Sequence, residues 1–405
     1  MTAITDIPNS RPLRLSTSRP GTLRIYNWPW RALSLRRLPA LAMLLMLVGG
    51  FAVSASFVIS GALQKAEVPL TFKSFTEGHS ASVLAKAYDA AMPARDFAIA
   101  LNTAWRTALF GEGSKGVVIG RNGTLFTAEE LDAPLDEAAR ASNAISFIVE
   151  TKSRLQLAGS ELVVVVVPAK TAIYGEMLGR TRQPELAAHR YQILHDALAA
   201  AGVAATDLKP LFIDHKSIEP VFLRTDTHWT PAGAGIAALA VANLIETRIP
   251  LPKLAFTEQR APVVQHTGDL MKFVPLQPWF SALQPAPDEI AGISAVKAAT
   301  DANASGDGAL FDDTAAPVGL VGTSYSANDL WGFEAALKLA LQADVVNYSK
   351  TGHGPYMPMR CFLARAAADP AILPKLVIWE IPERYLSLEA DARVADRAIP
   401  DNCEG

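Results

Sequence analysis

The sequence predicts an α/β sandwich with a mainly parallel sheet, preceded by one N-terminal membrane-spanning helix. From residue 111 onward, apolar β-branched runs alternate with segments of helical periodicity, as in strands joined by crossover helices. Leu162 is followed by five consecutive valines, a run that suits a strand covered on both faces. An uncharged stretch from Leu38 to Gln64 is long enough to cross a bilayer.

Length and charge narrow the class of protein. At 405 residues the chain can bury a substantial core in one large or two smaller domains. Its formal net charge of −3 argues against a general nucleic-acid-binding protein, because such proteins carry a basic surface. We therefore expect no nucleic-acid partner.

The charges near the N-terminus are unevenly distributed. Before Leu38 the only acidic residue is Asp6, whereas seven arginines accumulate there: Arg11, Arg14, Arg19, Arg24, Arg31, Arg36 and Arg37. As a helix, the uncharged run that follows would be roughly 39 Å long at about 1.5 Å per residue, against a hydrocarbon core of about 30 Å. The uncharged run therefore indicates a membrane-spanning segment.

A cleaved signal peptide is the alternative to an anchor, because small residues such as Ala52 and Ser54 lie near the end of the run. The long basic lead and the long apolar run favour an uncleaved signal anchor. Arginines on its N-terminal side place that end in the cytoplasm and everything after Lys65 outside it. We expect a single-pass inner-membrane protein whose folded domain lies in the periplasm.

These observations divide the chain into four predicted segments. They are a basic cytoplasmic segment (1–37), a transmembrane signal anchor (38–63), a tether and lead-in (64–110) and the α/β domain (111–405).

The α/β domain is expected to begin with two short strands around an Asn-Gly turn, between Val117 and Phe126, followed by capping-box spacing from Thr127 to Glu130. Helices are then expected at 134–157, 185–201, 231–247 and 329–341. Strands are expected at 162–167, 211–213, 318–321, 345–346 and 376–379. The segment 250–317, rich in Pro, Ala, Asp and Gly, is interpreted as loops and an insertion.

Asp226 and His228 stand two residues apart, immediately before a predicted helix start with Thr230 as N-cap and Pro231 at the first position. In an extended approach both side chains would point to one face. Such a pair lets the carboxylate fix the imidazole tautomer while the other ring nitrogen takes a proton from a nucleophile. Alternatively, Asp226 is a turn cap and His228 an ordinary surface histidine, so the hypothesis needs a matching serine.

Ser324 supplies that match, because it lies where the strand ending at Val321 gives way to a helix. Ser326 and Asp329 are expected to form the helix start. Serines at the carboxyl end of a sheet strand occupy the place where open α/β folds put their sites. Backbone N–H groups there can hold an oxyanion. The alternative is that Ser324 is only a small turn residue.

A Gly-rich loop follows the next strand and could supply a second backbone donor from Gly352 or Gly354. His353, between these glycines, is a rival base to His228. Tyr325 and Tyr174 complete the candidates for oxyanion or substrate contacts, although Tyr174 could also simply pack.

Roughly residues 110–390 resemble the alginate O-acetyltransferases of the AlgJ/AlgX type. The resemblance lies in the segments around Asp226, Ser324 and Gly352 and in the motif Ile378-Trp-Glu-Ile-Pro-Glu-Arg384. The resemblance implies an SGNH-hydrolase-like fold with the Asp/His segment before the serine, and a triad of Asp226, His228 and Ser324. We expect no carbohydrate-binding domain after the catalytic part, which favours the membrane-anchored AlgJ-like branch.

The resemblance further implies that acetyl groups are moved onto an exported polysaccharide, which could be alginate, cellulose or another exopolysaccharide. Ser324 would become an acetyl-serine and a sugar hydroxyl would then accept the group. Acetyl-CoA is not expected outside the cytoplasm, so a multipass membrane acyltransferase is the implied acetyl donor. No cofactor and no metal are expected. Two alternatives stay open, a polysaccharide acetyl esterase and a non-catalytic scaffold or binding subunit of a secretion complex.

The two cysteines, Cys361 and Cys403, both fall in the exported part under this topology. That compartment permits disulfides. Neither lies in a metal-like Cys-x-x-Cys spacing, so a single Cys361–Cys403 bridge is predicted.

Overall fold

The structure is a computed structural model that describes residues 38–59, 68–69, 71–92, 95–298, 316–388 and 403. The chain divides into two compact units, Met1–Arg95 and Asp96–Gly405. The predicted cytoplasmic segment, residues 1–37, lies outside the described residues.

In the described residues of the first unit lie the helices α1 (Leu38–Ile59), α3 (Phe72–Thr76) and α4 (His79–Ala91). Thr71 caps α3 because its hydroxyl accepts the Ser74 N–H. Helix α1 occupies most of the predicted anchor 38–63, whose last four positions lie outside the described residues. Among the helices that the structure describes, none has both the length and the hydropathy needed to cross a membrane.

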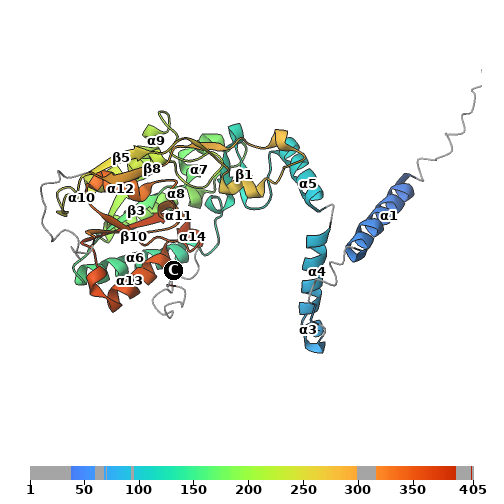
Figure 1. Cartoon of the computed structure of the whole chain (residues 1–405), viewed down its shortest axis with the longest axis horizontal. Coiled ribbons are helices and arrows are strands. Elements are labelled where there is room, and N and C mark those ends of the chain that lie inside the picture. Colours follow the sequence, from blue (N-terminus) through green and yellow to red (C-terminus); the bar gives the residue numbers. More distant parts are fainter. Residues whose placement is uncertain are drawn as a thin grey trace, which may run out of the picture. The chain divides into compact units, whose positions relative to one another are not determined.

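The second unit is built on a five-stranded parallel sheet in the order β10-β9-β11-β3-β4 (Figure 1). The strands are β3 (Glu161–Val167), β4 (Ala204–Asp207), β9 (Val318–Val321), β10 (Val345–Asn347) and β11 (Leu376–Pro382). Every residue of β3 pairs with β11, from Glu161 opposite Leu376 to Val167 opposite Pro382. The predicted parallel sheet is therefore confirmed.

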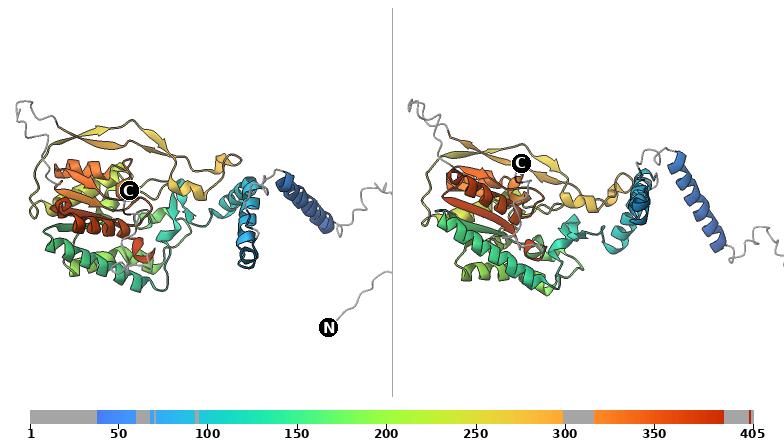
Figure 2. Two further views of the ribbon diagram at one scale, coloured as in Figure 1. Left: turned by 60° about the horizontal axis from the view of Figure 1, so that its bottom comes forward. Right: turned by 90° about the horizontal axis from the view of Figure 1, so that it is seen from below.

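Two layers of helices cover the sheet, as Figure 2 shows. Successive valines of β3 point to opposite faces of the sheet, so both faces are apolar. Val163, Val165 and Val167 join the core under α10 (Pro231–Ile245) and α12 (Phe333–Leu341). Val164 and Val166 join the core under α6 (Glu137–Leu157), α8 (Glu185–Ala200) and α13 (Tyr356–Ala368). The valine run is thus covered on both faces, as a central parallel strand requires.

Several further elements are short or lie at the edge of the second unit. They are α5 (Arg95–Phe110), α7 (Lys170–Ile173), α14 (Tyr385–Leu388) and the 3₁₀ turns at Arg121–Gly123, Ala128–Glu130, Gly175–Met177, Asp269–Phe273, Ser281–Leu283 and Pro370–Ile372.

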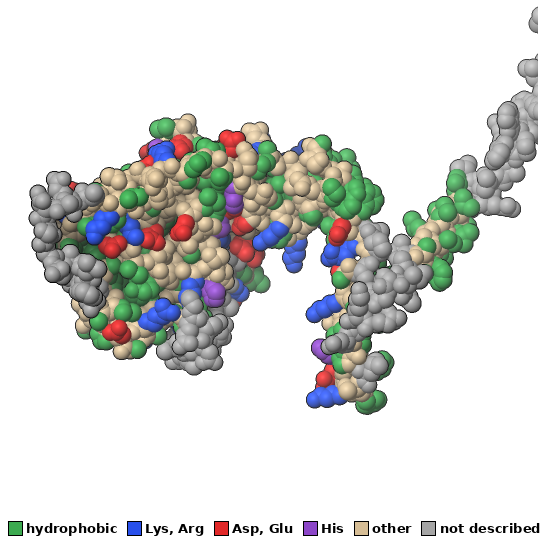
Figure 3. All heavy atoms as spheres, in the orientation of Figure 1, with side chains coloured by type: hydrophobic (Ala, Val, Ile, Leu, Met, Phe, Trp, Pro, Cys, Tyr) green, Lys and Arg blue, Asp and Glu red, His purple; other side chains and the backbone are tan. Residues whose placement is uncertain are grey.

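Helix α5 attaches to the second unit through small residues. Ala100, Thr103 and Ala104 are buried, and Ala104 packs in a cluster with Val117 and Leu125. Its large apolar side chains stay at the surface, where Figure 3 shows hydrophobic atoms gathered over this helix; they are Phe97, Leu101, Trp105, Leu109 and Phe110.

The predicted strand at Leu211–Ile213 is wrong, because these residues lie inside helix α9 (Leu208–His215). Leu208 and Phe212 are four residues apart and both are fully buried, which is a helical spacing. The strand after α8 is instead the short β4, whose Ala-Ala-Thr-Asp sequence carries little β signal.

The hairpin is confirmed as β1 (Val117–Ile119) paired with β2 (Leu125–Thr127). Asn122 at the turn has a φ of 56°, a left-handed conformation that asparagine tolerates. The segment 250–317 was expected to be irregular, and in the described part of it that expectation is only partly right. It forms two antiparallel pairs, β5 (Phe256–Arg260) with β8 (Ile293–Lys297) and β6 (Val264–His266) with β7 (Asp288–Ile290).

The helix start predicted at Ser326 and Asp329 is also wrong. A short helix α11 (Ser324–Ala327) begins earlier and is capped by Thr323, whose hydroxyl accepts the Tyr325 N–H. Helix α12 then starts separately at Phe333, after Gly332 in a left-handed conformation with φ 66°. The serine therefore opens its own short helix, directly above β9.

The Cys361–Cys403 disulfide is present, as predicted, and spans 42 residues of sequence. The Cys403 carbonyl also accepts bonds from Lys350 and Arg365, at 3.4 and 2.5 Å. This contact ties the end of the chain to α13 and to the loop after β10.

Candidate active site

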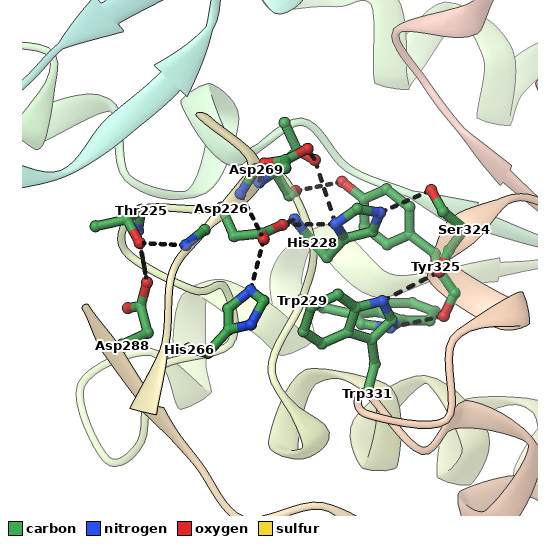
Figure 4. A network of polar contacts seen from close by, with 12 residues as sticks. Thr225, Asp226, His228, Trp229, His266, Asp269, Asp288, Ser324, Tyr325 and Trp331 are labelled. Atoms are coloured by element: carbon green, nitrogen blue, oxygen red, sulfur yellow. Dashed lines mark hydrogen bonds and ion pairs between the residues drawn. The ribbon is translucent and has the colours of Figure 1, made fainter. Parts of the chain in front are cut away.

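Asp226, His228 and Ser324 lie in one continuous row of hydrogen bonds (Figure 4). His228 Nδ1 lies 2.6 Å from Asp226 Oδ1, and His228 Nε2 lies 2.7 Å from Ser324 Oγ. Because an ionised carboxylate can only accept, Nδ1 carries the proton and Nε2 faces the serine hydroxyl as an acceptor. The structure brings together the three residues that the sequence singled out, with the imidazole oriented as a general base.

The backbone around the Asp226-x-His228 pair forms a tight loop that folds back on itself. Leu223 N–H donates to the His228 carbonyl, and Thr230 N–H to the Val221 carbonyl, both at 3.0 Å. The His228 N–H donates to Asp226 Oδ1 at 2.9 Å. Asp226 therefore caps a local turn and holds the imidazole with the same carboxylate, whereas His228 is buried and is not the surface histidine of the alternative.

Helix α10 starts as predicted, directly after this loop. Thr230 Oγ1 accepts the Gly233 N–H at 3.2 Å, and Pro231 occupies the first turn. A Cβ on Gly233 would lie 2.4 Å from the Val221 carbonyl oxygen, so only glycine allows the helix to pack this closely. The close approach fixes the loop that carries His228.

The turn that carries Ser324 is held from below by Glu380 of β11. This buried carboxylate accepts the Thr323 N–H at 2.7 Å, the Thr323 hydroxyl at 3.0 Å and the Ser326 hydroxyl at 3.1 Å. Burial raises the pKa of Glu380 to about 7, although these hydrogen bonds favour its charged form. Glu380 lies in the Ile378–Arg384 motif, and an acidic residue inside an apolar strand is the sequence signal for such a buried support.

Tyr325 points into the core. Its hydroxyl donates to the Thr227 carbonyl at 2.5 Å and accepts from Arg384 Nη1 at 3.1 Å. Burial raises the pKa of Tyr325 above its usual range. This candidate for substrate contact therefore joins the serine turn to the His228 segment through its side chain.

Trp331 forms one wall of the site. Its indole stacks on the His228 ring with centroids 4.9 Å apart and an interplanar angle of 16°. Its Nε1–H donates to the Ser324 carbonyl at 3.1 Å. Trp229 binds the next carbonyl, that of Tyr325, also at 3.1 Å. Two indoles thus fix the two successive backbone carbonyls that follow the serine side chain.

Residues of the segment 250–317 also bind the Asp226 carboxylate, and these contacts were not predicted from the sequence. Asp226 Oδ2 accepts from His266 Nε2 at 2.8 Å and from the Asp269 N–H at 2.9 Å. The Asp269 carboxylate accepts the Thr227 N–H at 2.9 Å and its hydroxyl at 2.8 Å. Asp288 on β7 binds both the N–H and the hydroxyl of Thr225.

These contacts set the charge of Asp226, which is only 2% exposed. Burial opposes ionisation, but the hydrogen bonds from His228 and then His266 outweigh it and hold the pKa of Asp226 well below its usual range. The carboxylate stays negative at any pH at which His228 could serve as a base.

Lys170 is a second unforeseen support. Its buried ammonium donates to three backbone carbonyls, those of Leu125 at 2.7 Å and of Arg224 and Asp226 at 3.0 Å. Burial lowers the pKa of Lys170 to about 8, while nearby carboxylates raise it. Lys170 thus joins the β2 hairpin to the loop that carries the Asp/His pair.

The remaining candidates lie around this centre. Tyr174 is half-buried and its hydroxyl accepts the Val221 N–H at 3.0 Å, which steadies the start of the loop. His353 is exposed and donates Nδ1–H to the Thr351 carbonyl at 2.8 Å, whereas His228 Nε2 lies 2.7 Å from Ser324 Oγ. Gly352 and Gly354 both have positive φ, 79° and 61°.

The loop of Gly352 and Gly354 packs on the serine turn. Lys350 N–H donates to the Gly322 carbonyl at 3.2 Å, and Asn347 Nδ2 donates to the Ser326 carbonyl at 2.8 Å. An oxyanion role for the two glycines stays a prediction.

Asp226, His228 and Asp269 also offer ligand atoms within 4.8 Å of one another, a spacing that a metal ion could use. In this structure the Asp226 and Asp269 carboxylates each accept several N–H or O–H donors, and His228 bonds both Asp226 and Ser324. The donor set is that of a hydrogen-bonded proton-transfer site.

Comparison with known proteins agrees with this geometry. The family model described as SGNH hydrolase-like domain, acetyltransferase AlgX, matches residues 117–383, more than half of the chain. A Pseudomonas syringae protein named probable alginate O-acetylase AlgJ is 43% identical over 307 residues, covering 75% of this chain and 78% of its own. Its namesake from Pseudomonas aeruginosa is 39% identical over 312 residues, covering 75% and 79%.

Among solved structures, the O-acetyltransferase domain of Pseudomonas putida AlgJ matches with a TM-score of 0.61 and 38% identity. The match covers 68% of this chain and 94% of that domain. The range 117–383 matched by the family model includes the five strands of the central sheet as well as Asp226, His228 and Ser324. This chain belongs to the family of SGNH hydrolase-like acetyltransferases that includes AlgJ and AlgX, and it is an acyltransferase.

Proposed function

We propose that this protein transfers acetyl groups, through an acetyl-enzyme on Ser324, onto hydroxyls of alginate or a similar exported polysaccharide. The observation that carries the proposal is the 2.7 Å contact between Ser324 Oγ and His228 Nε2, in line with the Asp226 carboxylate on the other ring nitrogen. General-base assistance of this kind contributes about 10²–10⁴-fold to a rate.

In the first half-reaction His228 takes the Ser324 hydroxyl proton while Oγ attacks the carbonyl carbon of the acetyl donor. The imidazolium then gives that proton to the leaving group, and acetyl-Ser324 remains. In the second half-reaction a sugar hydroxyl gives its proton to His228 and attacks the acetyl carbonyl. Collapse of the tetrahedral intermediate releases the sugar ester, and the proton returns to Ser324 Oγ. The charged Asp226 stabilises the imidazolium in both halves.

The choice of substrate rests on the relatives. The two AlgJ proteins are named as alginate O-acetylases, and 39–43% identity over three quarters of the chain supports the same class of acceptor. The acetyl donor is a multipass membrane acyltransferase that passes acetyl groups across the membrane.

The protein is anchored in the inner membrane by one span, with its second unit in the periplasm. The uncharged run 38–64 after an arginine-rich segment supports this topology. The Cys361–Cys403 disulfide suits an oxidising compartment.

The test is a transfer assay with the full chain, p-nitrophenyl acetate as donor and deacetylated alginate oligosaccharides as acceptor. Expected results are acetylated oligosaccharides and, when the acceptor is left out, an acetylated peptide containing Ser324. Release of acetate without transfer at saturating acceptor would make the protein an esterase. A chain that neither turns over the donor nor becomes acetylated would be a scaffold.

A further inference from the structure

We propose that His266 is a positioning residue for the acetyl-transfer reaction. It holds the Asp226 carboxylate from the side opposite His228 and so sets the direction of the Asp226–His228 hydrogen bond. The catalytic consequence rests on the proposed function, whereas the geometric consequence does not.

The two oxygens of Asp226 are divided between two imidazoles (Figure 4). Oδ1 accepts from His228 Nδ1 at 2.6 Å, and Oδ2 accepts from His266 Nε2 at 2.8 Å. A carboxylate held at one oxygen can still rotate about its Cβ–Cγ bond. A carboxylate held at both oxygens by rings from different chain segments has one orientation, and that orientation fixes where Nε2 of His228 points.

His266 is itself held in place. It ends strand β6 and pairs with Asp288 on β7, and the Asp288 carboxylate binds Thr225, the residue before Asp226. Its ring meets the face of Trp331 edge-on, with centroids 5.4 Å apart and an interplanar angle of 84°. Trp331 in turn stacks on His228. Strand β6 therefore positions the His266 imidazole, and Trp331 contacts both this ring and that of His228.

Among the described residues, Asp226 Oδ2 also accepts the backbone N–H of Asp269, and Oδ1 also accepts that of His228, both at 2.9 Å. Loss of the His266 bond would leave Oδ2 with one contact from a 3₁₀ turn. The carboxylate would gain freedom to rotate, and the bond to His228 would lengthen and bend. A displacement of about 1 Å at a reacting group can cost on the order of 10²-fold in rate.

Two amide substitutions, His266→Gln and His266→Asn, distinguish a hydrogen-bonding role of His266 from a role in packing alone. In His266→Gln the amide N–H₂ group reaches about as far as the imidazole Nε2, so the donor to Oδ2 is kept. In His266→Asn the side chain is one methylene shorter, so the donor falls short. Gln265→Ala changes the exposed neighbour on the same strand, whose side chain bonds Glu289, and serves as the matched control.

The measurements are kcat and KM for acetyl transfer, and the low-field proton resonance of the His228 Nδ1–H···Asp226 bond by NMR without substrate. We expect His266→Asn to lower kcat about 10–100-fold at unchanged KM and to move the resonance upfield. His266→Gln should restore most of kcat and the resonance, and Gln265→Ala should match the unsubstituted protein. Equal values for the Asn and Gln variants, in rate and in resonance, would overturn the proposal.

The NMR comparison needs no turnover. If the unsubstituted protein fails to transfer acetyl groups, the proposed function fails, while the resonance in the Gln and Asn variants still decides whether His266 orients the Asp226–His228 bond. A resonance that shifts in neither variant would refute the positioning role even in an active enzyme.

Discussion

The hydroxyl of Tyr325 donates a hydrogen bond to the backbone carbonyl of Thr227 at 2.5 Å. The residue after the serine is thereby bonded to the residue before the histidine, although Ser324 and His228 are 96 positions apart in sequence. This bond lies beneath the reacting atoms and holds two separate chain segments at a fixed spacing.

Ser324→Ala is expected to abolish acetyl transfer, with a loss of roughly 10⁴–10⁶-fold in kcat, because no other oxygen stands beside His228 Nε2 in the described site. His228→Ala should be nearly as severe. Both proteins should fold, as judged by circular dichroism and melting temperature. His353→Ala, at an exposed histidine, is the control and should keep its activity. If instead His353→Ala is dead and His228→Ala active, the assignment of the base is wrong.

Asp226→Asn preserves the shape of the side chain but offers an N–H₂ group as well as a carbonyl. The amide can favour the tautomer with the proton on His228 Nε2, which can no longer accept from Ser324 Oγ. A fall of about 10⁴-fold in kcat with little change in KM is expected. Activity within a few-fold of the unsubstituted enzyme would show that His228 keeps its tautomer without Asp226.

Tyr325→Phe removes the hydroxyl that bridges Thr227 and Arg384. Because both partners are buried, the loss should lower the free energy of unfolding by about 1–3 kcal/mol and reduce kcat through the His228 segment. Urea denaturation and the transfer assay measure the two effects. Tyr348→Phe is the control, since among the described contacts the Tyr348 hydroxyl has no hydrogen bond and the substitution should change neither quantity.

Glu383→Gln should change how stability depends on pH. Both carboxylate oxygens of Glu383 are buried without a hydrogen-bond partner among the described residues, and burial raises the pKa of this group from 4.5 to about 8. Between these values the native chain holds a proton that the unfolded chain has lost, so this group's contribution makes stability fall as pH rises.

The glutamine variant lacks that contribution. Its stability relative to the unsubstituted protein should therefore increase by up to about 1.4 kcal/mol per pH unit between roughly pH 5 and 8. Urea unfolding at several pH values measures the difference, with the exposed Glu161→Gln as a control that stays flat. A difference that is constant with pH would show that Glu383 ionises normally in the native state.

The proposed topology predicts that protease added to intact spheroplasts digests the chain after Lys65, because an arginine-rich flank favours a cytoplasmic N-terminus. A tag placed before residue 38 should stay protected until lysis. The reverse pattern, with the second unit protected in intact spheroplasts, would invert the proposed orientation.

The main residues of the site carry local sequence signals that made them candidates, and the resemblance to the AlgJ/AlgX family joined them into one triad. Asp226 and His228 precede a capped helix, and Ser324 follows a buried strand. The Leu211–Ile213 error arose because a short apolar run fits a strand as well as one turn of helix. Ser326 has the spacing of a cap, but its hydroxyl donates to Glu380 on a strand more than fifty residues later.

His266 and Asp269 could not be predicted in the same way. They belong to a segment without periodicity, and their only link to Asp226 is tertiary. A histidine followed by a glycine and an aspartate in a loop-like stretch has no local feature that distinguishes it from surface residues. Contacts of this kind become visible only when the insertion is placed against the sheet.

The stacking of Trp331 on His228 gives the protein a built-in optical probe. An indole in face contact with an imidazole loses fluorescence when that imidazole becomes positively charged, and the Trp331 N–H also senses the Ser324 carbonyl directly. Protonation of His228 and acylation of the neighbouring serine should therefore each change the emission of this one side chain. The difference spectrum between the protein and its Trp331→Phe variant would follow the enzyme through its catalytic cycle without a chromogenic substrate.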